Sequence, residues 1–389
     1  MSRLDELLSE LCPDGVEYKT IGEIATDIFR GSGIKRDDIT EYGTPCIRYG
    51  EIYTTYNIWF DKCVSHVQIN KVQSPKYFEY GDILFAITGE SIEDIAKSVA
   101  YVGHDKCLAG GDIVVVKHNQ DPRYLSYALS TTNARKQKSA GKVKSKVVHA
   151  SVPSISGIVI PVPPLPIQHE IVRILDGFTE LTAELTAELT ARKKQYEYYR
   201  EYLFTWEADT VKMVKLGEIA EVGTGSSNTN EGLDHGKFPF FVRSQEPRWK
   251  NEYEYDETAI ITAGDGVGVG KVFHYICGKY ALHQRAYRIH ITSNIVLPKY
   301  FYYYMRTAFF RYITKTMYEG SVPSIRRPML LAFPVPVPSL DEQHRTIAIL
   351  DRFDVLCNDI DNGIPAEIAA RQKQYEYYRD KLLTFKPLS

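Results

Sequence analysis

The 389-residue sequence lacks the features that mark secreted, membrane-spanning and zinc-binding proteins. Its six cysteines are scattered and form no C-x-x-C pair, which argues against a zinc site or a disulfide framework and suits a reducing compartment. No apolar run approaches the roughly 18 residues of a membrane span, and the charged N-terminus does not resemble a signal peptide. We therefore expect a cytoplasmic protein without membrane contact.

An excess of positive charge is also absent, because the formal net charge is -2 at pH 7. Composition therefore does not by itself indicate nucleic-acid binding, although DNA affinity depends on where Lys and Arg lie locally.

The Gly-rich run from Gly264 to Val272 departs from a P-loop, since Asp265 replaces a required Gly and Val272 a required Ser or Thr. A turn that brings the backbone to a DNA phosphate, with Lys271 adding charge, is favoured over nucleotide binding. The ten histidines show no metal-ligand spacing, so no metal site is predicted.

A tandem repeat dominates what is present. The six residues Q-Y-E-Y-Y-R at 195–200 recur at 374–379, and the shorter blocks G-E-I-A, Q-H and I-L-D also occur twice in the same order. V-P-S-I at 152–155 likewise recurs at 322–325. The segments between these blocks differ in length and in sequence. The chain is therefore predicted to be a shared frame that carries two divergent inserts.

Short apolar runs bounded by Gly, Asn and Asp predict β-strands in both inserts. The clearest runs are residues 81–87, 112–117, 259–263 and 286–291. One helix in each insert is predicted at about 122–138 and 298–313, and Pro-rich strings at 160–166 and 333–338 predict stiff, extended connectors. The predicted fold class is α+β, with curved or barrel-like β-sheets in two domains and two long helices that form an antiparallel coiled coil.

An amphipathic helix follows each connector. A helix from about Gln168 to Phe204 would be roughly 55 Å long, and an apolar stripe of that length is not stable when exposed. The two helices should therefore pack on each other; the alternative is that each packs only on its own domain. Gly363-Ile364-Pro365 should kink or break the second helix. The predicted stripe consists of Ile171, Ile174, Phe178, Leu181, Leu185, Tyr196 and Tyr199, followed by Ile347, Leu350, Tyr375 and Tyr378.

Residues 181–191 of the first helix repeat a four-residue unit, L-T-A-E. Leucines at every fourth position lie nearly in line, and Ala and Glu favour helix. One unit more or less would change the length of the helix by about 6 Å and rotate its end by roughly 40°. The unit is either a spacer of adjustable length or simply a helix-favouring stretch, and both interpretations can hold.

This arrangement resembles the specificity subunit of type I restriction–modification enzymes. The resemblance rests on P-x-x-x-Q-x-x-I-v-x-I-L-D at 164–176 and R-x-K-Q-Y-x-Y-Y-R at 192–200, with second copies at 343–351 and 371–379, and it covers the whole chain. The break expected at 363–365 departs from the family's pair of antiparallel helices.

The resemblance implies two target-recognition domains, each reading one half of a split, asymmetric DNA sequence. It implies double-stranded DNA and two methyltransferase (modification) subunits as partners, with the latter docked on the repeated helices, and restriction/translocase subunits that join through the complex. S-adenosylmethionine, ATP and Mg would be bound by those partners, so no cofactor and no catalytic residue are expected here. The sequence indeed lacks a D/N-P-P-Y/F motif. The expected segments are a first recognition domain at 1–163, a first spacer helix region at 164–208, a second recognition domain at 209–338 and a second spacer helix region at 339–389.

Residues expected to contact DNA lie in basic stretches and polar loops, because phosphates need cations and base edges need Arg, Asn, Gln or Ser. Six positive charges lie between Arg135 and Lys146, which favours phosphate contact over a solvated helix end. Small polar loops at 31–36 and 223–228 follow the matched G-E-I-A blocks. The candidates are Ser32, Lys35, Arg36, Arg48, Tyr49, Lys142, Lys144, Lys146, Ser226, Asn228, Arg243, Gln245, Lys271, Gln284, Arg285, Arg326 and Arg327.

Two other classes of function compete with DNA recognition. A fused nuclease or methyltransferase is disfavoured by the missing motifs. A coiled-coil scaffold, whose two variable domains bind protein rather than DNA, would be favoured if the inserts ignored DNA and salt.

Overall fold

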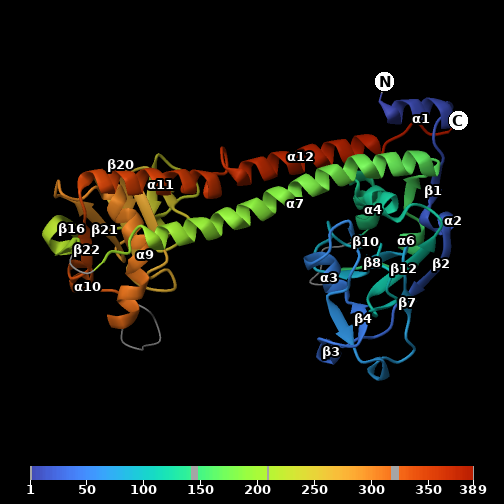
Figure 1. The fold of residues 1–389 in the computed structure, drawn as a ribbon, viewed down its shortest axis with the longest axis horizontal. Helices are drawn as coiled ribbons and strands as arrows, with labels where there is room; N and C mark the ends of the chain where they lie inside the picture. The colour runs from blue at the N-terminus through green and yellow to red at the C-terminus, as the bar shows by residue number, and fades with distance from the viewer. Residues whose placement is uncertain (1, 142–147, 208–209, 317–323, 389) are drawn as a thin grey trace. The chain divides into compact units, whose positions relative to one another are not determined.

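The computed structural model describes residues 2–141, 148–207, 210–316 and 324–388 (Figure 1). Contacts divide the chain into two compact units: unit 1 is Met1–Glu184 with Ile368–Ser389, and unit 2 is Leu185–Glu367. Both boundaries fall inside long helices. Each unit therefore contains part of the segments expected as spacer regions.

Unit 1 contains two five-stranded sheets. The first has the order β2 (Ala25–Arg30), β12 (Ile113–His118), β8 (Ile83–Ala86), β10 (Ser98–Tyr101) and β5 (Trp59–Phe60). The second has the order β3 (Ile39–Thr40), β6 (Ser65–Val67), β4 (Thr44–Ile47), β11 (Cys107–Ala109) and β7 (Tyr77–Phe78). Strand β8 is buried along its whole length, as its apolar sequence I-L-F-A predicts.

Helices and two further strand pairs also belong to unit 1. The pairs are β1 (Tyr18–Thr20) with β14 (Val159–Pro161) and β9 (Thr88–Gly89) with β13 (Val148–His149). The helices are α1 (Arg3–Leu11), α2 (Ile21–Ile24), α3 (Tyr49–Thr54), α4 (Pro122–Ser130), α5 (Thr132–Ser139) and α6 (Val152–Ser156). Asp121 caps α4 by accepting the backbone N–H groups of Arg123 and Tyr124, and Pro122 occupies the first turn, where it costs no hydrogen bond.

Unit 2 is built on one six-stranded sheet. Its order is β16 (Ala220–Thr224), β21 (Ala286–Ile291), β19 (Tyr255–Ala263), β20 (Phe273–Leu282), β17 (Phe238–Phe241) and β18 (Arg248–Lys250). Strands β15 (Lys212–Lys215) and β22 (Pro334–Val337) form a separate pair, and the helices are α8 (Leu216–Ile219), α9 (Pro298–Thr316), α10 (Arg327–Leu331) and α11 (Leu340–Asn358). Aromatic side chains of α9, among them Tyr300, Phe301 and Phe309, pack against the sheet in the core.

The strands and helices predicted in the inserts are present, with two refinements. The helix predicted at 122–138 is divided at Thr131 into α4 and α5, and the Pro-rich connectors contribute residues to the paired strands β14 and β22. Proline is tolerated there because each strand belongs to a two-stranded sheet and has a free edge. The sheets are open and not closed barrels, since the described strands pair in linear order and the outer ones, β2 and β5 for example, do not meet.

The two halves of the repeat meet as antiparallel helices within each unit (Figure 1). In unit 1, α12 (Ile364–Leu382) lies along α7 (Leu165–Tyr202), and the rings of Phe178 and Tyr378 stack with centroids 5.6 Å apart. In unit 2, Tyr196 and Tyr199 of α7 both stack on Phe353 of α11, at 5.8 and 5.5 Å. The predicted antiparallel packing is thus confirmed inside each unit.

The predicted break in the second helix is also present. Helix α11 ends at Asn358 and α12 begins at Ile364, with Asp359 accepting the backbone N–H groups of Asp361 and Asn362 between them. A β-carbon at Gly363 would collide with the carbonyl oxygen of Val355, so the turn requires glycine there.

The apolar stripe is only partly as predicted. Ile171, Leu350, Tyr196 and Tyr375 are buried, and Ile174, Phe178, Leu185, Tyr199 and Ile347 are half-buried. Leu181 and Tyr378 are each 37% exposed, while Leu175, which the prediction did not include, is fully buried. The correction arises because the first turns of α7 pack on the core of unit 1 as well as on α12, which turns a different face inward. No helix in the described parts of the chain is long and apolar enough to span a membrane.

Candidate nucleic-acid interface

A buried glutamine in each unit connects a long helix to the start of a shorter one, α4 in unit 1 and α9 in unit 2. Gln168 of α7 accepts the Asp121 N–H at 3.0 Å and donates to the Pro163 carbonyl at 2.7 Å. Gln343 of α11 does the same in unit 2: it accepts the Leu297 N–H at 2.8 Å and donates to the Pro338 carbonyl at 3.0 Å. The repeated Q-H block thus supplies a side chain that satisfies the backbone at the start of α4 and α9.

The aspartate of the repeated I-L-D block makes the second contact. Asp176 accepts hydrogen bonds from Arg123 and Tyr127 of α4, both at 2.7 Å. Asp351 accepts equivalent bonds from Lys299 and Tyr303 of α9, at 2.8 and 2.5 Å. Burial raises the pKa of both tyrosines, so their hydroxyl groups remain donors. We call Gln168 with Asp176, and Gln343 with Asp351, the clamp of each unit.

Strand register shows which loop positions of the two units are equivalent. Parallel strands pair Ile47 with Ala109 in unit 1 and Phe241 with Leu282 in unit 2. The loops that follow these strands, with their neighbours, form one edge that we call the rim. The rim of unit 1 is residues 31–36, 48–51, 88–90 and 110–112, and that of unit 2 is residues 226–231, 242–245, 264–271 and 283–285.

Four predicted DNA-contacting residues of unit 2 lie together on its rim. Arg243 and Arg285 both pair with Asp265, at 2.6 and 3.1 Å, and Gln284 donates a hydrogen bond to Asn228. Burial tends to raise the pKa of Asp265, but hydrogen bonds and charge from the two arginines outweigh it and lower the pKa. The carboxylate is therefore charged, and both guanidinium groups retain N–H donors that face solvent.

Ser227, next to predicted Ser226 and Asn228, organises the start of this rim. Its hydroxyl donates to Glu254 at 2.6 Å and accepts from Lys250 at 2.8 Å, while the Ser226 backbone N–H donates to the same carboxylate. Ser226 and Asn228 are left exposed on either side.

The rim of unit 1 has the same frame and different side chains. Arg36, Arg48 and Tyr49 line one groove of about 600 Å³, and Lys35 is exposed beside it. Their contact with DNA stays a prediction. Arg48 pairs with Glu51 at 3.2 Å, which orients its guanidinium group. Where unit 2 has Arg243, Asp265 and Arg285, the register places Tyr49, Thr88 and Asp112 in unit 1.

Ser32 was predicted to contact DNA, and the structure corrects this. It is buried, its hydroxyl donates to the Ser74 carbonyl at 2.7 Å and it accepts the Lys76 N–H at 2.8 Å. Both hydrogen-bonding capacities are used inside unit 1. Its bridge to Gly110 matches that of Ser227 to His283, so these two serines are structural counterparts.

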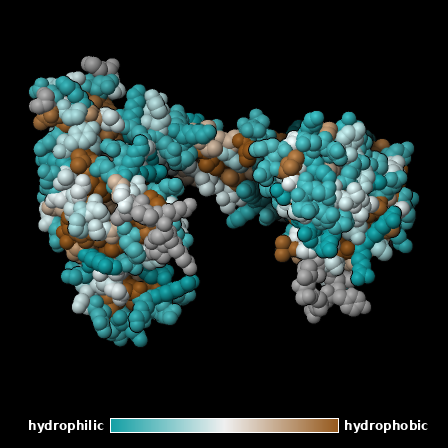
Figure 2. Space-filling model, turned by 180° about the vertical axis from the view of Figure 1, so that it is seen from behind, coloured by the Kyte–Doolittle hydropathy of each residue, from teal (hydrophilic) through white to brown (hydrophobic). Residues whose placement is uncertain are grey.

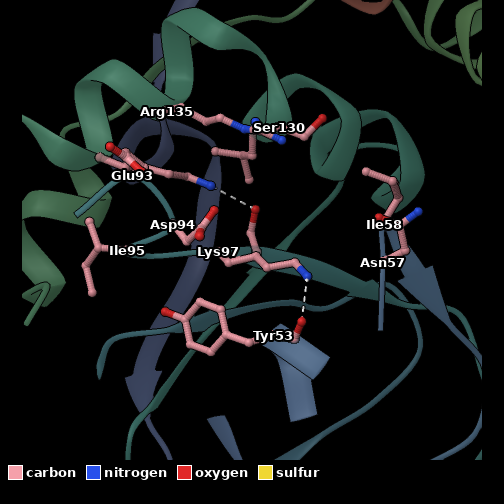
Figure 3. A pocket seen from close by; sticks show the side chains of 12 residues that line it. Tyr53, Asn57, Ile58, Glu93, Asp94, Ile95, Lys97, Ser130 and Arg135 are labelled. Carbon is pink, nitrogen blue, oxygen red and sulfur yellow. Dashed lines mark hydrogen bonds between the residues drawn. The ribbon is translucent and has the colours of Figure 1, made fainter. Parts of the chain in front are cut away.

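The lysine-rich stretch is only partly within the described residues. Lys142, Lys144 and Lys146 lie outside them. Lys138, counted with that stretch in the sequence, is buried: it donates to Ser98 at 3.1 Å and lies over the Phe85 ring. It lines a pocket of about 290 Å³ together with Arg135 and Lys97, whose ammonium group donates to the Tyr53 carbonyl (Figure 3).

The remaining predicted residues lie on the rim of unit 2 or beside it. Lys271 is exposed at the end of the Gly264 loop, and Arg326 and Arg327 are exposed beside it, because the Ile325 N–H donates to the Gly264 carbonyl. Gln245, in the 242–245 loop of the rim, also lines a pocket of about 480 Å³ near Asp351 of the clamp. The Gly264 loop also presents Val267, 91% exposed, which composition did not single out.

One sequence match proves to be misaligned. The V-P-S-I block at 152–155 begins α6, and its structural counterpart is α10, which begins at Arg327 with Pro328 in its first turn. Ile325 corresponds to Ala150 instead, since both donate a backbone N–H to the equivalent carbonyl groups of Gly264 and Ile87. The described residues of the second block, Ser324 and Ile325, therefore correspond to His149 and Ala150 and not to Ser154 and Ile155.

Comparison with known proteins connects this frame to one family. The family model described as type I restriction modification DNA specificity domain matches residues 13–192 and again residues 208–370. The chain belongs to this family. The two matches cover most of the chain, and each includes the rim and the clamp of one unit.

Individual relatives of this family agree. The specificity subunit of a type I restriction enzyme of Escherichia coli is 39% identical over 244 residues, 57% of this chain and 60% of that protein. A putative type I restriction enzyme specificity subunit of Haemophilus influenzae is 34% identical over 272 residues, 63% of this chain and 68% of that protein. The fold matches the crystal structure of a type I restriction–modification S subunit from M. genitalium, with a TM-score of 0.59 at 16% identity over 95% of this chain and 96% of that one.

Sequence reasoning missed the acidic residues of the two rims. Asp265 and Glu51 carry negative charge among residues chosen for positive or neutral polarity, so a search for DNA-contacting types passes over them. A useful signal was present for Asp265, which interrupts a run of glycines. Groups of His, Cys, Asp and Glu that could hold a metal ion were not found among the described residues.

Proposed function

We propose that this chain is a non-catalytic DNA-specificity subunit whose two units each read one half of a bipartite, asymmetric sequence in double-stranded DNA. The observation that carries this proposal is the pair of rims, which share strand register and backbone contacts but present different side chains. A shared frame suits two like tasks, and unlike residues suit two different half-sites. The face of each unit that Figure 2 shows is mostly hydrophilic, as a wet DNA interface requires.

We propose further that the repeated helices dock two methyltransferase (modification) subunits. The repeated Q-Y-E-Y-Y-R segment buries its first tyrosine in each unit, but its second, Tyr198 or Tyr377, is 63% or 62% exposed. The same outward surface therefore occurs twice, which suits two copies of one partner. S-adenosylmethionine, ATP and Mg would then be bound by those partners and by restriction/translocase subunits that join the complex, in the cytoplasm.

The experiment that tests this function is methylation mapping. The chain is co-expressed with its methyltransferase subunits in a host without other DNA methylation, and modified adenines are mapped across the genome. We expect a single bipartite motif with two unlike halves and a gap of constant length. Methylation without sequence preference would contradict DNA recognition and would favour a scaffold whose variable domains bind protein.

A second experiment, the same mapping with two variants, shows which unit reads which half-site. Arg48→Ala alters the rim of unit 1 and Arg243→Ala that of unit 2, and each should relax one half of the motif and leave the other unchanged. Loss of both halves with either variant would show that the units do not read separately.

A further inference from the structure

One carboxylate in the rim of unit 2 holds two arginines. Asp265 Oδ1 is 2.6 Å from Arg243 Nη1, and its Oδ2 is 3.1 Å from Arg285 Nη1. Each oxygen of the carboxylate is thus committed to a different guanidinium group. The side chain of Asp265 is 23% exposed, whereas those of Arg243 and Arg285 are 39% and 63% exposed, so the pair reaches beyond the carboxylate into solvent.

The backbone around Asp265 is fixed to both arginine-bearing loops. The Gly264 N–H donates to the Arg285 carbonyl at 2.9 Å, and the Ile325 N–H donates to the Gly264 carbonyl at 2.9 Å. Gly268 packs so closely on the Arg243 carbonyl that a β-carbon there would lie 2.5 Å from its oxygen. Gly266, between them, has a φ of +83°, which glycine adopts without strain. The carboxylate therefore has little freedom to move away from either arginine.

This arrangement restricts two otherwise flexible side chains before any ligand binds. A guanidinium group has five N–H donors in a planar fork, and one of them is used here by each arginine, which leaves parallel donors for a second bidentate partner. In a DNA major groove, the partner that matches such a fork is the O6 and N7 pair of guanine. Each oxygen of Asp265 already accepts a hydrogen bond from one of the two arginines.

A carboxylate at a DNA-binding edge also repels phosphate, so it weakens binding to every sequence alike. Its presence is understandable if the gain lies in discrimination between bases, because pre-organised arginines lose less freedom when they meet the correct base. On the proposed DNA-reading function, we propose that Asp265 is a positioning residue that holds Arg243 and Arg285 for the recognition of guanine in the half-site bound by unit 2.

Unit 1 provides an internal contrast. Its rim has Thr88 in the register of Asp265, and its aspartate at the position of Arg285, Asp112, pairs with Arg30 at 2.8 Å. Among the described rim residues, an aspartate paired with two arginines therefore occurs in unit 2 alone. The effects of replacing Asp265 should be confined to one half of the target.

The test uses the complex of the full chain with its methyltransferase subunits and the target found by methylation mapping. Each guanine of the half-site assigned to unit 2 is replaced by 7-deazaguanine, which has a C–H group in place of the N7 acceptor. Competition binding compares wild type, Asp265→Asn and the control Asp234→Asn. The control removes an equal charge from unit 2 at an exposed residue that lies 3.5 Å from Arg248 and touches neither rim arginine.

We expect wild type and Asp234→Asn to bind at least one 7-deazaguanine duplex roughly 10- to 150-fold more weakly than the unmodified duplex, because one hydrogen bond from a charged guanidinium group, the one to N7, is lost. For Asp265→Asn, the logarithm of the affinity ratio between the unmodified and the 7-deazaguanine duplex should be less than half of the wild-type value. Recognition of the other half-site should be unchanged. Equal discrimination by Asp265→Asn and wild type would overturn the proposal, and so would indifference of wild type to every 7-deazaguanine in that half-site.

A second variant keeps the proposal testable if Asp265→Asn lowers the melting temperature of the chain. Arg285→Ala removes the guanidinium group altogether, and it should abolish discrimination at one guanine only. Unchanged discrimination at every guanine in Arg285→Ala would count against the proposal. Failure of the proposed function would give a different result, because the wild-type complex would then show no sequence preference at either half-site.

Discussion

The clamp glutamine of unit 2 offers a sharp test of how the repeated block works. Gln343 is fully buried, and its amide makes three hydrogen bonds to backbone groups: it accepts the Leu297 N–H and donates to the Ile295 and Pro338 carbonyls at 2.8–3.0 Å. Gln343→Ala would leave all three groups without that partner. At about 1 kcal/mol for each hydrogen bond, we expect a loss of roughly 3 kcal/mol in the free energy of unfolding.

The assay is thermal unfolding, with His344→Ala as the matched control. His344 is the exposed neighbour in the same Q-H block, and surface substitutions usually change stability by less than about 0.5 kcal/mol. A loss of 3 kcal/mol corresponds to a decrease of roughly 6–12 °C for a domain of this size. A melting temperature for Gln343→Ala within about 2 °C of His344→Ala would refute the clamp.

A second substitution at the same residue separates hydrogen bonding from volume. Gln343→Glu keeps the shape but sets a carboxylate oxygen against the Ile295 and Pro338 carbonyls. Burial and these oxygens should raise the pKa of the introduced carboxyl group in the folded state above its unfolded value of about 4.3. Stability is then greatest below that value and is lost as the pH rises through the raised pKa. Equal pH dependence of this variant and wild type would contradict this reasoning.

Three further predictions concern the helices and the buried lysine. Deletion of residues 182–185, one unit of the repeat, should shorten the gap between half-sites by about one or two base pairs, since it removes about 6 Å of helix; methylation mapping checks this, and a changed half-site sequence would refute the spacer interpretation. Tyr198→Ala with Tyr377→Ala should reduce co-purification of methyltransferase subunits without lowering the melting temperature; undiminished co-purification would refute docking there. Burial, followed by the charge of Arg135, lowers the pKa of Lys138 to about 7. The unfolded chain keeps this lysine protonated up to about pH 10, so Lys138 makes the free energy of unfolding increase between about pH 7 and 10. Lys138→Met should remove up to ~1.4 kcal/mol per pH unit of that increase, measured by urea unfolding. The control Lys136→Met should leave it unchanged.

The local pattern of the sequence determined which segments form strands and helices. Runs such as 286–291 became strands at the predicted bounds, and the break before Pro365 followed from the backbone geometry of Gly and Pro. The repeat was likewise visible without coordinates, because identical blocks preserve the residues that make identical contacts. Gln168 and Gln343 are such residues, although their contacts with the starts of α4 and α9 appeared only in the structure.

Tertiary structure alone decided which faces and which charges matter. The face that α7 buries depends on two neighbours, so a single period predicted Leu181 inside and missed Leu175. Strand register, which joins residues far apart in the chain, showed that Ser32 is structural and that Ile325 is the counterpart of Ala150 and not of Ile155 in α6. The pairing of Asp265 with two arginines from separate loops is likewise a long-range contact. Local periodicity therefore specified the duplicated frame, whereas the residues of the interface depended on contacts that only the folded chain creates.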